Sequence, residues 1–185
     1  MAALLQIADP YRRAQQGLVL PPSRLKTQGW DVIYAPFVVG RRYSSRFSDG
    51  SYGAWYGGRM LQTAIAETRY HRNRLLAQSG APDTTLALRA FAVDIDGKLH
   101  DLRGLRDRMA SVFASDDYAK SQGLARRLHN GGSFGIAYDS VRHDGGQCAC
   151  AFHPDVLGAC RILGDFLYHW NGVSIDAVYQ RLRSP

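Results

Sequence analysis

The sequence predicts an α+β fold in a single domain, residues 1–185. At 185 residues with 45% hydrophobic content, the chain is long enough for one packed core and short for two. Apolar residues between Arg59 and about Gln78 recur at helical spacing, whereas those between Thr84 and Ile95 alternate with period two for part of the segment. Because the second half of the chain is strand-rich, helices and strands do not alternate regularly.

The N-terminal region carries three local signals. Asp9-Pro10 is typical of a helix start, so we expect a short helix over Tyr11–Gln16. Pro21-Pro22 predicts an extended linker. The segment Trp30–Val39 is rich in β-forming residues, and Pro36 restricts it to an edge strand or a bulged strand.

The predicted helix from Arg59 to Gln78 carries a glutamate, Glu67. Gly80 stands just past the end of the pattern, where a helix commonly stops. At 100° per residue Glu67 lies beside the apolar stripe, where the wall of a pocket could include it. A solvated glutamate that pairs with His71 one turn later is the alternative.

The second half of the chain gives a series of shorter elements. Leu99–Leu105 is a short irregular or strand segment, and Cys160–Trp170 and Val173–Leu182 mix strand and helix signals, so no element is assigned to the last two. The remaining expectations are a helix over Arg106–Phe113, a helix over Asp116–His129 capped by Ser115 and stopped by Asn130-Gly131-Gly132, a strand over Phe134–Tyr138, a polar turn over Asp139–Gly146 and a strand over Gln147–Phe152.

The formal net charge of +7 comes from twenty arginines and three lysines. Arginine forms bidentate contacts with phosphate or carboxylate, so the excess is compatible with a nucleotide, a nucleic acid or an acidic protein. A genome rich in G and C produces the same bias without any functional meaning. No run of five or six like charges indicates a basic tail for nucleic acid.

Neither a membrane span nor a secretory leader is visible, so we expect a cytoplasmic protein without a membrane partner. Cys148, Cys150 and Cys160 are an odd, clustered set, which argues against a disulfide framework. With His153 they supply four zinc-ligand types, but the C-x-C spacing lacks the usual C-x-x-C pair, and core thiols are favoured. No metal is expected.

The stretch from Arg46 to His71 brings an arginine, an aromatic ring and a carboxylate near one another. Its glycines allow tight turns and a close approach of the backbone to a ligand, which suits a nucleotide. A surface hairpin that leads into an amphipathic helix is the alternative. The sequence contains no G-x-S-x-G, Walker or H-E-x-x-H motif, so hydrolase, P-loop and zincin functions have no support.

Four residues in this pattern, Arg46, Tyr56, Glu67 and Ser140, stand in motifs that resemble the RES-domain toxins of bacterial toxin–antitoxin pairs. The resemblance spans about residues 40 to 155. One departure is the strand after the serine, where many relatives have an asparagine and this chain has Cys148 or Ala149. The matching motifs are Arg46-Phe47-Ser48, Trp55-Tyr56-Gly57, Thr63-Ala64-Ile65-Ala66-Glu67, Gly135-Ile136-Ala137-Tyr138-Asp139-Ser140, Gly145-Gly146 and Phe152.

The resemblance implies an ADP-ribosyltransferase-like fold, a mixed sheet core with flanking helices. It also implies that NAD+ is the substrate and is broken down to nicotinamide or used to pass ADP-ribose to a protein. The expected protein partner is a cognate antitoxin of the Xre, helix-turn-helix type.

Each of the four residues has an expected role in such a site. A carboxylate stabilises the oxocarbenium-like state formed as the nicotinamide–ribose bond breaks, and Glu67 is the candidate. Arg46 would bind a phosphate and Tyr56 would contact a flat ring, both within the catalytic centre. Ser140 would form a hydrogen bond within the NAD+-binding site. Two other functions stay open: a basic nucleic-acid-binding or RNA-cleaving toxin, and a catalytically inactive binding module.

Overall fold

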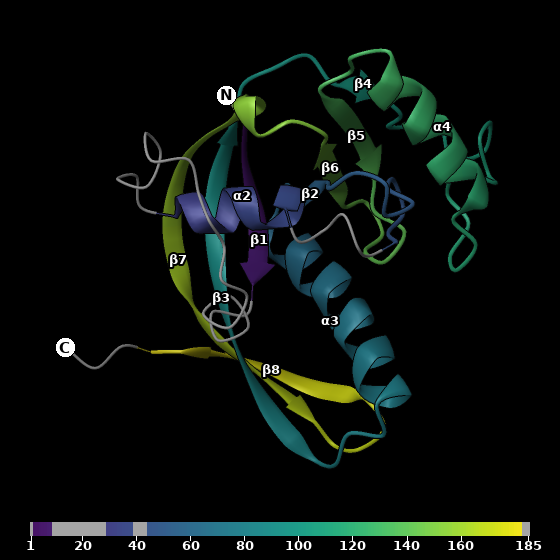
Figure 1. Ribbon diagram of the computed structural model, residues 1–185. Helices are drawn as coiled ribbons and strands as arrows, with labels where there is room; N and C mark the ends of the chain where they lie inside the picture. Colours follow the sequence, from purple (N-terminus) through teal and green to yellow (C-terminus); the bar gives the residue numbers. More distant parts are fainter. Residues whose placement is uncertain (1, 9–28, 39–43, 183–185) are drawn as a thin grey trace.

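One mixed β-sheet forms the centre of the computed structural model, which describes residues 2–8, 29–38 and 44–182 (Figure 1). Within these residues the sheet has eight strands in the order β4-β5-β6-β2-β1-β3-β7-β8. β4 and β5 are parallel, and the other neighbouring strands are antiparallel. The strands are β1 (Ala2–Ala8), β2 (Trp55–Gly58), β3 (Thr84–Ile95), β4 (His100–Asp101), β5 (Gly135–Asp139), β6 (Gln147–Ala151), β7 (Leu157–Trp170) and β8 (Ile175–Arg181).

Helices pack against both faces of this sheet, and the side chains of β3 alternate between the two helices. Leu88 and Ala90 face the α-helix α3 (Leu61–Gln78) and belong to a buried cluster with Leu76. Val93 points to the opposite face and joins a cluster with Ile33 of the helix α2 (Trp30–Val38). Since successive side chains of a strand point to opposite faces, α2 and α3 cover different sides of the sheet.

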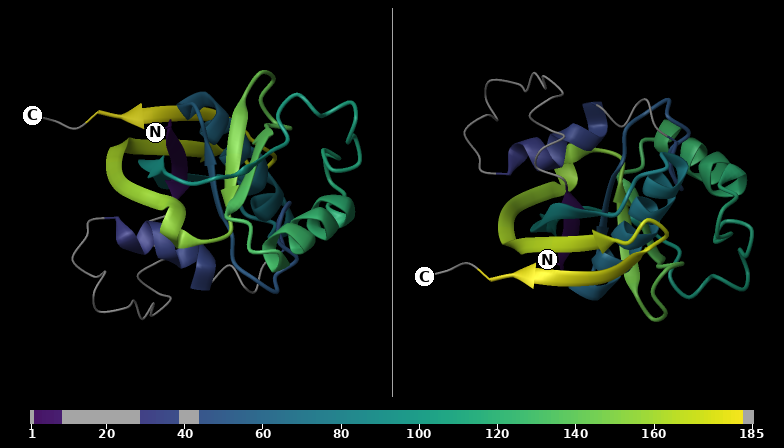
Figure 2. Two further views of the ribbon diagram at one scale, coloured as in Figure 1. Left: turned by 90° about the horizontal axis from the view of Figure 1, so that it is seen from above. Right: turned by 90° about the horizontal axis from the view of Figure 1, so that it is seen from below.

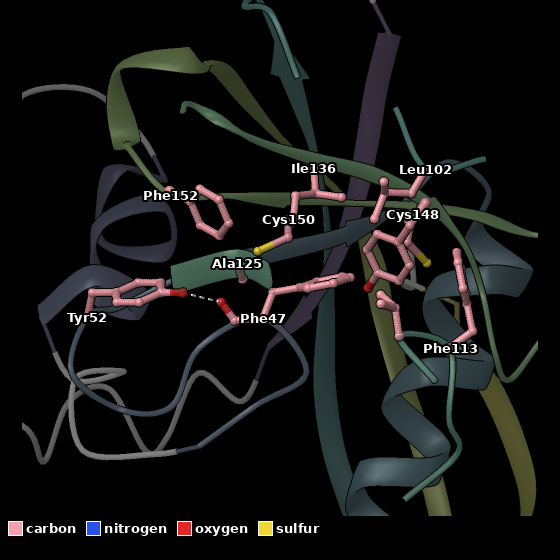
Figure 3. Packing of buried hydrophobic residues seen from close by; sticks show 11 residues of the cluster. Phe47, Tyr52, Leu102, Phe113, Ala125, Ile136, Cys148, Cys150 and Phe152 are labelled. Atoms are coloured by element: carbon pink, nitrogen blue, oxygen red, sulfur yellow. Dashed lines mark hydrogen bonds between the residues drawn. The ribbon is translucent and has the colours of Figure 1, made fainter. Parts of the chain in front are cut away.

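A third cluster covers β5 and β6 on the side that α3 also occupies (Figure 3). It includes Cys148, Cys150, Phe47, Phe113 from the connection between β4 and β5, and Ala125 from the helix α4 (Ala119–Asn130). Figure 2 shows α4 on the side of β5 and β6, away from α2. The cluster therefore holds α4 and its preceding loop against β5 and β6. A short 3-10 helix, η2 (Pro154–Val156), leads into β7.

The expected α+β class with a mixed sheet and flanking helices is confirmed. β3 has the expected bounds, Thr84–Ile95, and α3 ends at Gln78, with Gly80 in the left-handed conformation (φ 59°). α4 ends at Asn130, one residue past the expected His129, and Gly131 and Gly132 follow it. Leu99–Leu105 contains only the two-residue strand β4, and the unassigned C-terminal segment forms the hairpin β7–β8. The segments Tyr11–Gln16 and Pro21-Pro22 lie outside the described residues.

The prediction of a strand over Trp30–Val39 is wrong, because residues Trp30–Val38 form α2 with Pro36 inside the helix. Burial overrides local propensity here: Ile33 is 1% exposed and packs with Trp55 and Val93. Pro36 removes one helical hydrogen bond but leaves its backbone carbonyl close to Gly53.

Two predictions in the connection between β4 and β5 are also wrong. Residues 106–113 form turns rather than a helix, although Met109 N–H does donate to Leu105 O. α4 begins at Ala119 rather than Asp116, and Ser115 does not cap it. Instead, the Ser115 hydroxyl accepts a hydrogen bond from Arg142, and Asp117 accepts one from the Ala119 N–H. Tertiary contacts of this segment replace the regular helix that its composition favours. Across the described ranges, no helix combines the length and the apolar character needed to cross a membrane.

Two glycine substitutions test the close contact between α2 and the segment before β2. Gly53→Ala should destabilise the fold by about 1–3 kcal/mol, because its Cβ would clash with Pro36 O and Phe37 Cα, which are backbone atoms. Gly123→Ala, within α4, meets no atom within 4 Å and should stabilise the protein by about 0.5–1 kcal/mol. Urea unfolding measures both. Equal stability of the two variants would contradict the packing of α2 against this segment.

Candidate functional site

A cleft of about 960 Å³ opens between α3 and the loop that leads into α4. Its floor comes from the sheet, with Tyr56, Gly57, Tyr138 and Cys148. One wall is the face of α3 from Ala64 to Gln78. The opposite wall is formed by residues 116–119 together with the segment that contains Ser44, Ser45 and Arg46.

Glu67 lies on the α3 wall and is the only glutamate of the chain. Its Oε1 accepts a hydrogen bond of 2.7 Å from the Ser140 hydroxyl, and the Cys148 thiol approaches the same oxygen at 3.9 Å. Within the described ranges, Oε2 has no hydrogen-bond partner. One carboxylate oxygen is therefore fixed by the protein, and the other is available to a ligand in the cleft.

Ser140 is 1% exposed and does not line the cleft. While its hydroxyl donates to Glu67, its oxygen accepts from the backbone N–H groups of Arg142 (3.1 Å) and His143 (3.0 Å). These two donors orient the hydroxyl proton toward the carboxylate. In this structure Ser140 positions Glu67, and its expected contact with NAD+ stays a prediction.

The turn that carries Ser140 is attached to α3 at a second point. The Thr63 hydroxyl and His143 Nδ1 lie 2.9 Å apart, one helical turn before Glu67. Gly146 is required here, because a Cβ at this position would lie 2.8 Å from both Thr63 Oγ1 and His143 Nδ1. The two attachments hold the turn along α3.

Arg46 reaches the cleft from the segment before β2 and is 8% exposed. One terminal nitrogen donates to the carbonyls of Val112 (3.1 Å) and Ala114 (2.9 Å), and the guanidinium lies 4.8 Å from the ring centroid of Tyr118. Its Nε and second terminal nitrogen have no hydrogen-bond partner in the part of the chain that the structure describes. Arg46 therefore holds the loop wall and keeps donors for a ligand.

Tyr56, on β2, contributes its ring to the floor, while its hydroxyl is used within the protein. This hydroxyl lies 2.8 Å from Ser45 Oγ and accepts a hydrogen bond of 2.9 Å from the Phe47 N–H. Burial raises the pKa of Tyr56 well above its ordinary value, so the hydroxyl stays protonated. These bonds hold the segment around Arg46 against β2, and they leave the ring to contact a ligand.

Arg142, which the sequence analysis did not identify, connects the three sides of the site. Its guanidinium lies 3.3 Å from the ring centroid of Tyr70 on α3, and it donates to the hydroxyl (2.6 Å) and the carbonyl of Ser115 in the loop wall. Tyr70 in turn donates to Asp116. A lone arginine in a polar turn gives no signal in the sequence, because its partners come from distant segments.

The cysteines lie on different sides of the sheet. Cys148 and Cys150 both face the α4 side, as expected for C-x-C on a strand, whereas Cys160 packs against the cluster under α2. Burial raises the pKa of the Cys148 thiol to about 12, and the charge of Glu67 acts in the same direction. Cys148 lines the cleft, whereas Ala149 packs in the cluster under α2. Among the described residues, no group of three or more His, Cys, Asp or Glu side chains is arranged to hold a metal ion.

The cleft thus combines the Glu67 carboxylate on α3, the free donors of the buried Arg46 and several aromatic rings, while Asp116 and Asp117 add carboxylates on the loop wall. The rings of Tyr56, Tyr138 and Tyr118 supply flat apolar surfaces. The arginine donors suit a phosphate, and the carboxylate oxygen suits a hydroxyl or a developing positive charge. A ligand that contains both phosphate and a planar ring would match all three features.

Comparisons with known proteins place this arrangement in a family. A family model described as "RES domain" matches residues 21–171. Among solved structures, a chain of the crystal structure of the M. tuberculosis MbcT-MbcA toxin-antitoxin complex shares the fold with a TM-score of 0.57 and 12% sequence identity. The similarity covers 92% of this chain and 84% of that chain. No curated protein sequence matches.

The match to the family model includes Arg46, Tyr56, Glu67 and Ser140 and covers most of the chain. The expected resemblance is therefore confirmed, and the chain belongs to the RES domain family.

Proposed function

We propose that this protein cleaves the nicotinamide–ribose bond of NAD+ and that it is the toxin of a toxin–antitoxin pair. The observation that carries the proposal is the state of Glu67 on the wall of a large cleft, with Oε1 bound to Ser140 and Oε2 without a hydrogen-bond partner among the described residues. Family membership and the shared fold with a chain of a toxin–antitoxin complex support the biological role.

The proposed chemistry uses the charge of Glu67. As the bond breaks, its electron pair stays on the nicotinamide nitrogen, and positive charge develops on the ribose carbon and ring oxygen. A fixed carboxylate oxygen next to the ribose stabilises that charge more strongly than it stabilises the bound substrate. Nicotinamide leaves as a neutral molecule, so no strong general acid is required.

Arg46 and the tyrosine rings would bind the rest of the dinucleotide. The Nε and second terminal nitrogen of Arg46 can donate to a phosphate while its first terminal nitrogen stays on the loop carbonyls. Tyr56, whose hydroxyl is held by Ser45 and Phe47, presents its ring without losing further rotational freedom. NAD+ is a substrate here, and the proposed step requires no metal.

The expected setting is the cytoplasm, with a cognate antitoxin of the Xre, helix-turn-helix type as the partner. The ADP-ribose released from NAD+ would pass to water, to phosphate or to a cellular protein. Incubating the purified protein with NAD+ labelled in the adenosine part separates these acceptors. Free nicotinamide with label only in small molecules indicates degradation, and label on a discrete protein indicates transfer. No nicotinamide release, even with cell lysate present, would refute the proposed activity.

Glu67→Gln tests the catalytic carboxylate. The amide oxygen can still accept from Ser140, but the negative charge is lost, so turnover should fall on the order of 100-fold or more. The thermal midpoint should hardly change, since the position is only partly buried. Asp107→Asn, an exposed carboxylate outside the cleft, should keep normal turnover. Full NAD+ consumption by the Glu67 variant would rule out this site.

Ser140→Ala tests whether the hydroxyl positions Glu67. The change leaves the partly buried N–H groups of Arg142 and His143 without their acceptor, and it should cost about 1–3 kcal/mol of stability. Turnover should fall about tenfold because Glu67 loses its fixed partner. Thr63→Val, which removes only the contact with His143, is the matched control. If both variants lose turnover equally, attachment of the turn to α3 matters and the bond to Glu67 does not.

Co-expression tests the proposed partner. Growth of a bacterial host should stop when this protein is made alone and should continue when its neighbouring gene is co-expressed. Association of the two proteins should weaken as salt rises if the partner face is acidic, given the net charge of +7. Equal survival with and without the neighbour would count against an antitoxin.

A further inference from the structure

His71 lies one helical turn after Glu67 on the cleft wall of α3, and nothing described above uses it. Both residues line the cleft. Side chains four residues apart on a helix have Cβ atoms about 6 Å apart, so an atom bound near Glu67 is also within reach of His71. His71 as a whole residue is exposed.

The two side chains do not bind each other. No hydrogen bond or ion pair joins Glu67 and His71, although both belong to the described part of the chain, so the expected alternative of a Glu67–His71 pair does not occur here. Neither ring nitrogen of His71 has a hydrogen-bond partner within the described ranges. The neighbouring Tyr70 ring packs edge-on at 5.2 Å between centroids. Among the described residues, neither the ring nitrogens of His71 nor Oε2 of the neighbouring Glu67 thus has a hydrogen-bond partner.

We propose that His71 is a catalytic base that removes the proton from a neutral hydroxyl acceptor, water in the simplest case, when this acceptor attacks the ribose carbon. The inference rests on the proposed cleavage of NAD+ and adds the class of acceptor to it. The acceptor oxygen forms a bond to the ribose carbon as the bond to nicotinamide breaks. Its proton passes to a ring nitrogen of His71 and then to solvent, while nicotinamide leaves with the electron pair.

The protonation state of His71 suits this role. Partial shielding from water by the surrounding protein is the largest cause that lowers the pKa of His71 below its ordinary value of 6.5. Arg142 from the polar turn, Arg74 on α3 and Arg46 from the opposite wall act in the same direction, and only Glu67 opposes them. The imidazole is therefore neutral at pH 7 and able to accept a proton.

The position of His71 points to a neutral acceptor. A hydroxyl must lose its proton as it attacks the ribose carbon, whereas an anion attacks without a base. Of the arginines around this space, Arg74 donates to Tyr70 and Arg142 to Ser115, and the donors that Arg46 keeps would be used by a phosphate of NAD+. His71 supplies the base that a hydroxyl acceptor needs.

The test compares acceptors that do and do not carry a proton to be removed. His71→Ala and the matched control Arg69→Ala, an exposed α3 residue outside the cleft, are assayed for nicotinamide release in water, in azide and in phosphate. In His71→Ala the rate in water should fall on the order of 100-fold, whereas transfer to azide, which needs no base, should stay near the wild-type rate. The control should keep both rates.

The pH profile supplies a second readout. The wild-type rate in water should decline as pH falls through a pKa below 6.5, because protonated His71 cannot accept a proton, and this limb should be absent from His71→Ala. An unchanged rate in water, an equal loss in water and azide, or a wild-type rate that phosphate raises above the rate in water would each overturn the inference. A wild-type protein that releases no nicotinamide with any acceptor would instead refute the proposed cleavage itself.

Discussion

The attachment of the polar turn Asp139–Gly146 to α3 is the constraint on which the site depends. Two contacts one helical turn apart, Ser140 with Glu67 and His143 with Thr63, hold the turn along the helix. They also tie α3, which packs over β3, β7 and β8, to the strands β5 and β6 that the turn connects. The position of the Glu67 carboxylate is therefore set by both halves of the sheet at once.

Buried polar groups near this turn are satisfied in a chain of contacts. The Ser140 oxygen accepts hydrogen bonds from two backbone N–H groups, and its hydroxyl proton is therefore directed toward Glu67. Arg46 and Arg142 hold the loop wall at neighbouring points, through Val112, Ala114 and Ser115. Because several distant segments share these bonds, they hold the loop wall in place at several points.

Local sequence patterns were sufficient to predict the helices and strands in which buried residues recur at a regular spacing. α3 and β3 are such elements, since one face of each packs against the other. The patterns failed at α2 and at residues 106–113. At α2, packing of Ile33 and Phe37 under the sheet outweighs the β-forming composition of the segment. At residues 106–113, hydrogen bonds from Arg46 outweigh the helix-forming composition.

Part of the site could be predicted from the sequence because three of its residues lie close together in the chain. Arg46, Tyr56 and Glu67 lie within 22 residues of one another, and the motif resemblance identified them together with Ser140. The other residues around the cleft could not be predicted from the sequence. Tyr118, Tyr138 and Arg142 come from segments far along the chain, and only the folded sheet brings them near the cleft. His71 was visible in sequence only as a partner for Glu67, a contact that the structure does not contain.

The parallel pairing of β4 with β5 has a consequence for how such a cleft can change. Parallel neighbours cannot be joined by a tight hairpin and need a connection of about a dozen residues or more, and here residues 102–134 make that connection across one face of the sheet. The same connection forms the wall opposite Glu67. Changes in the length or sequence of this connection therefore alter the wall opposite Glu67, whereas α3 and the strands β3 and β7 also pack against one another. Topology thus separates the part of the protein that carries the Glu67 carboxylate from the part that lines the opposite side of the cleft.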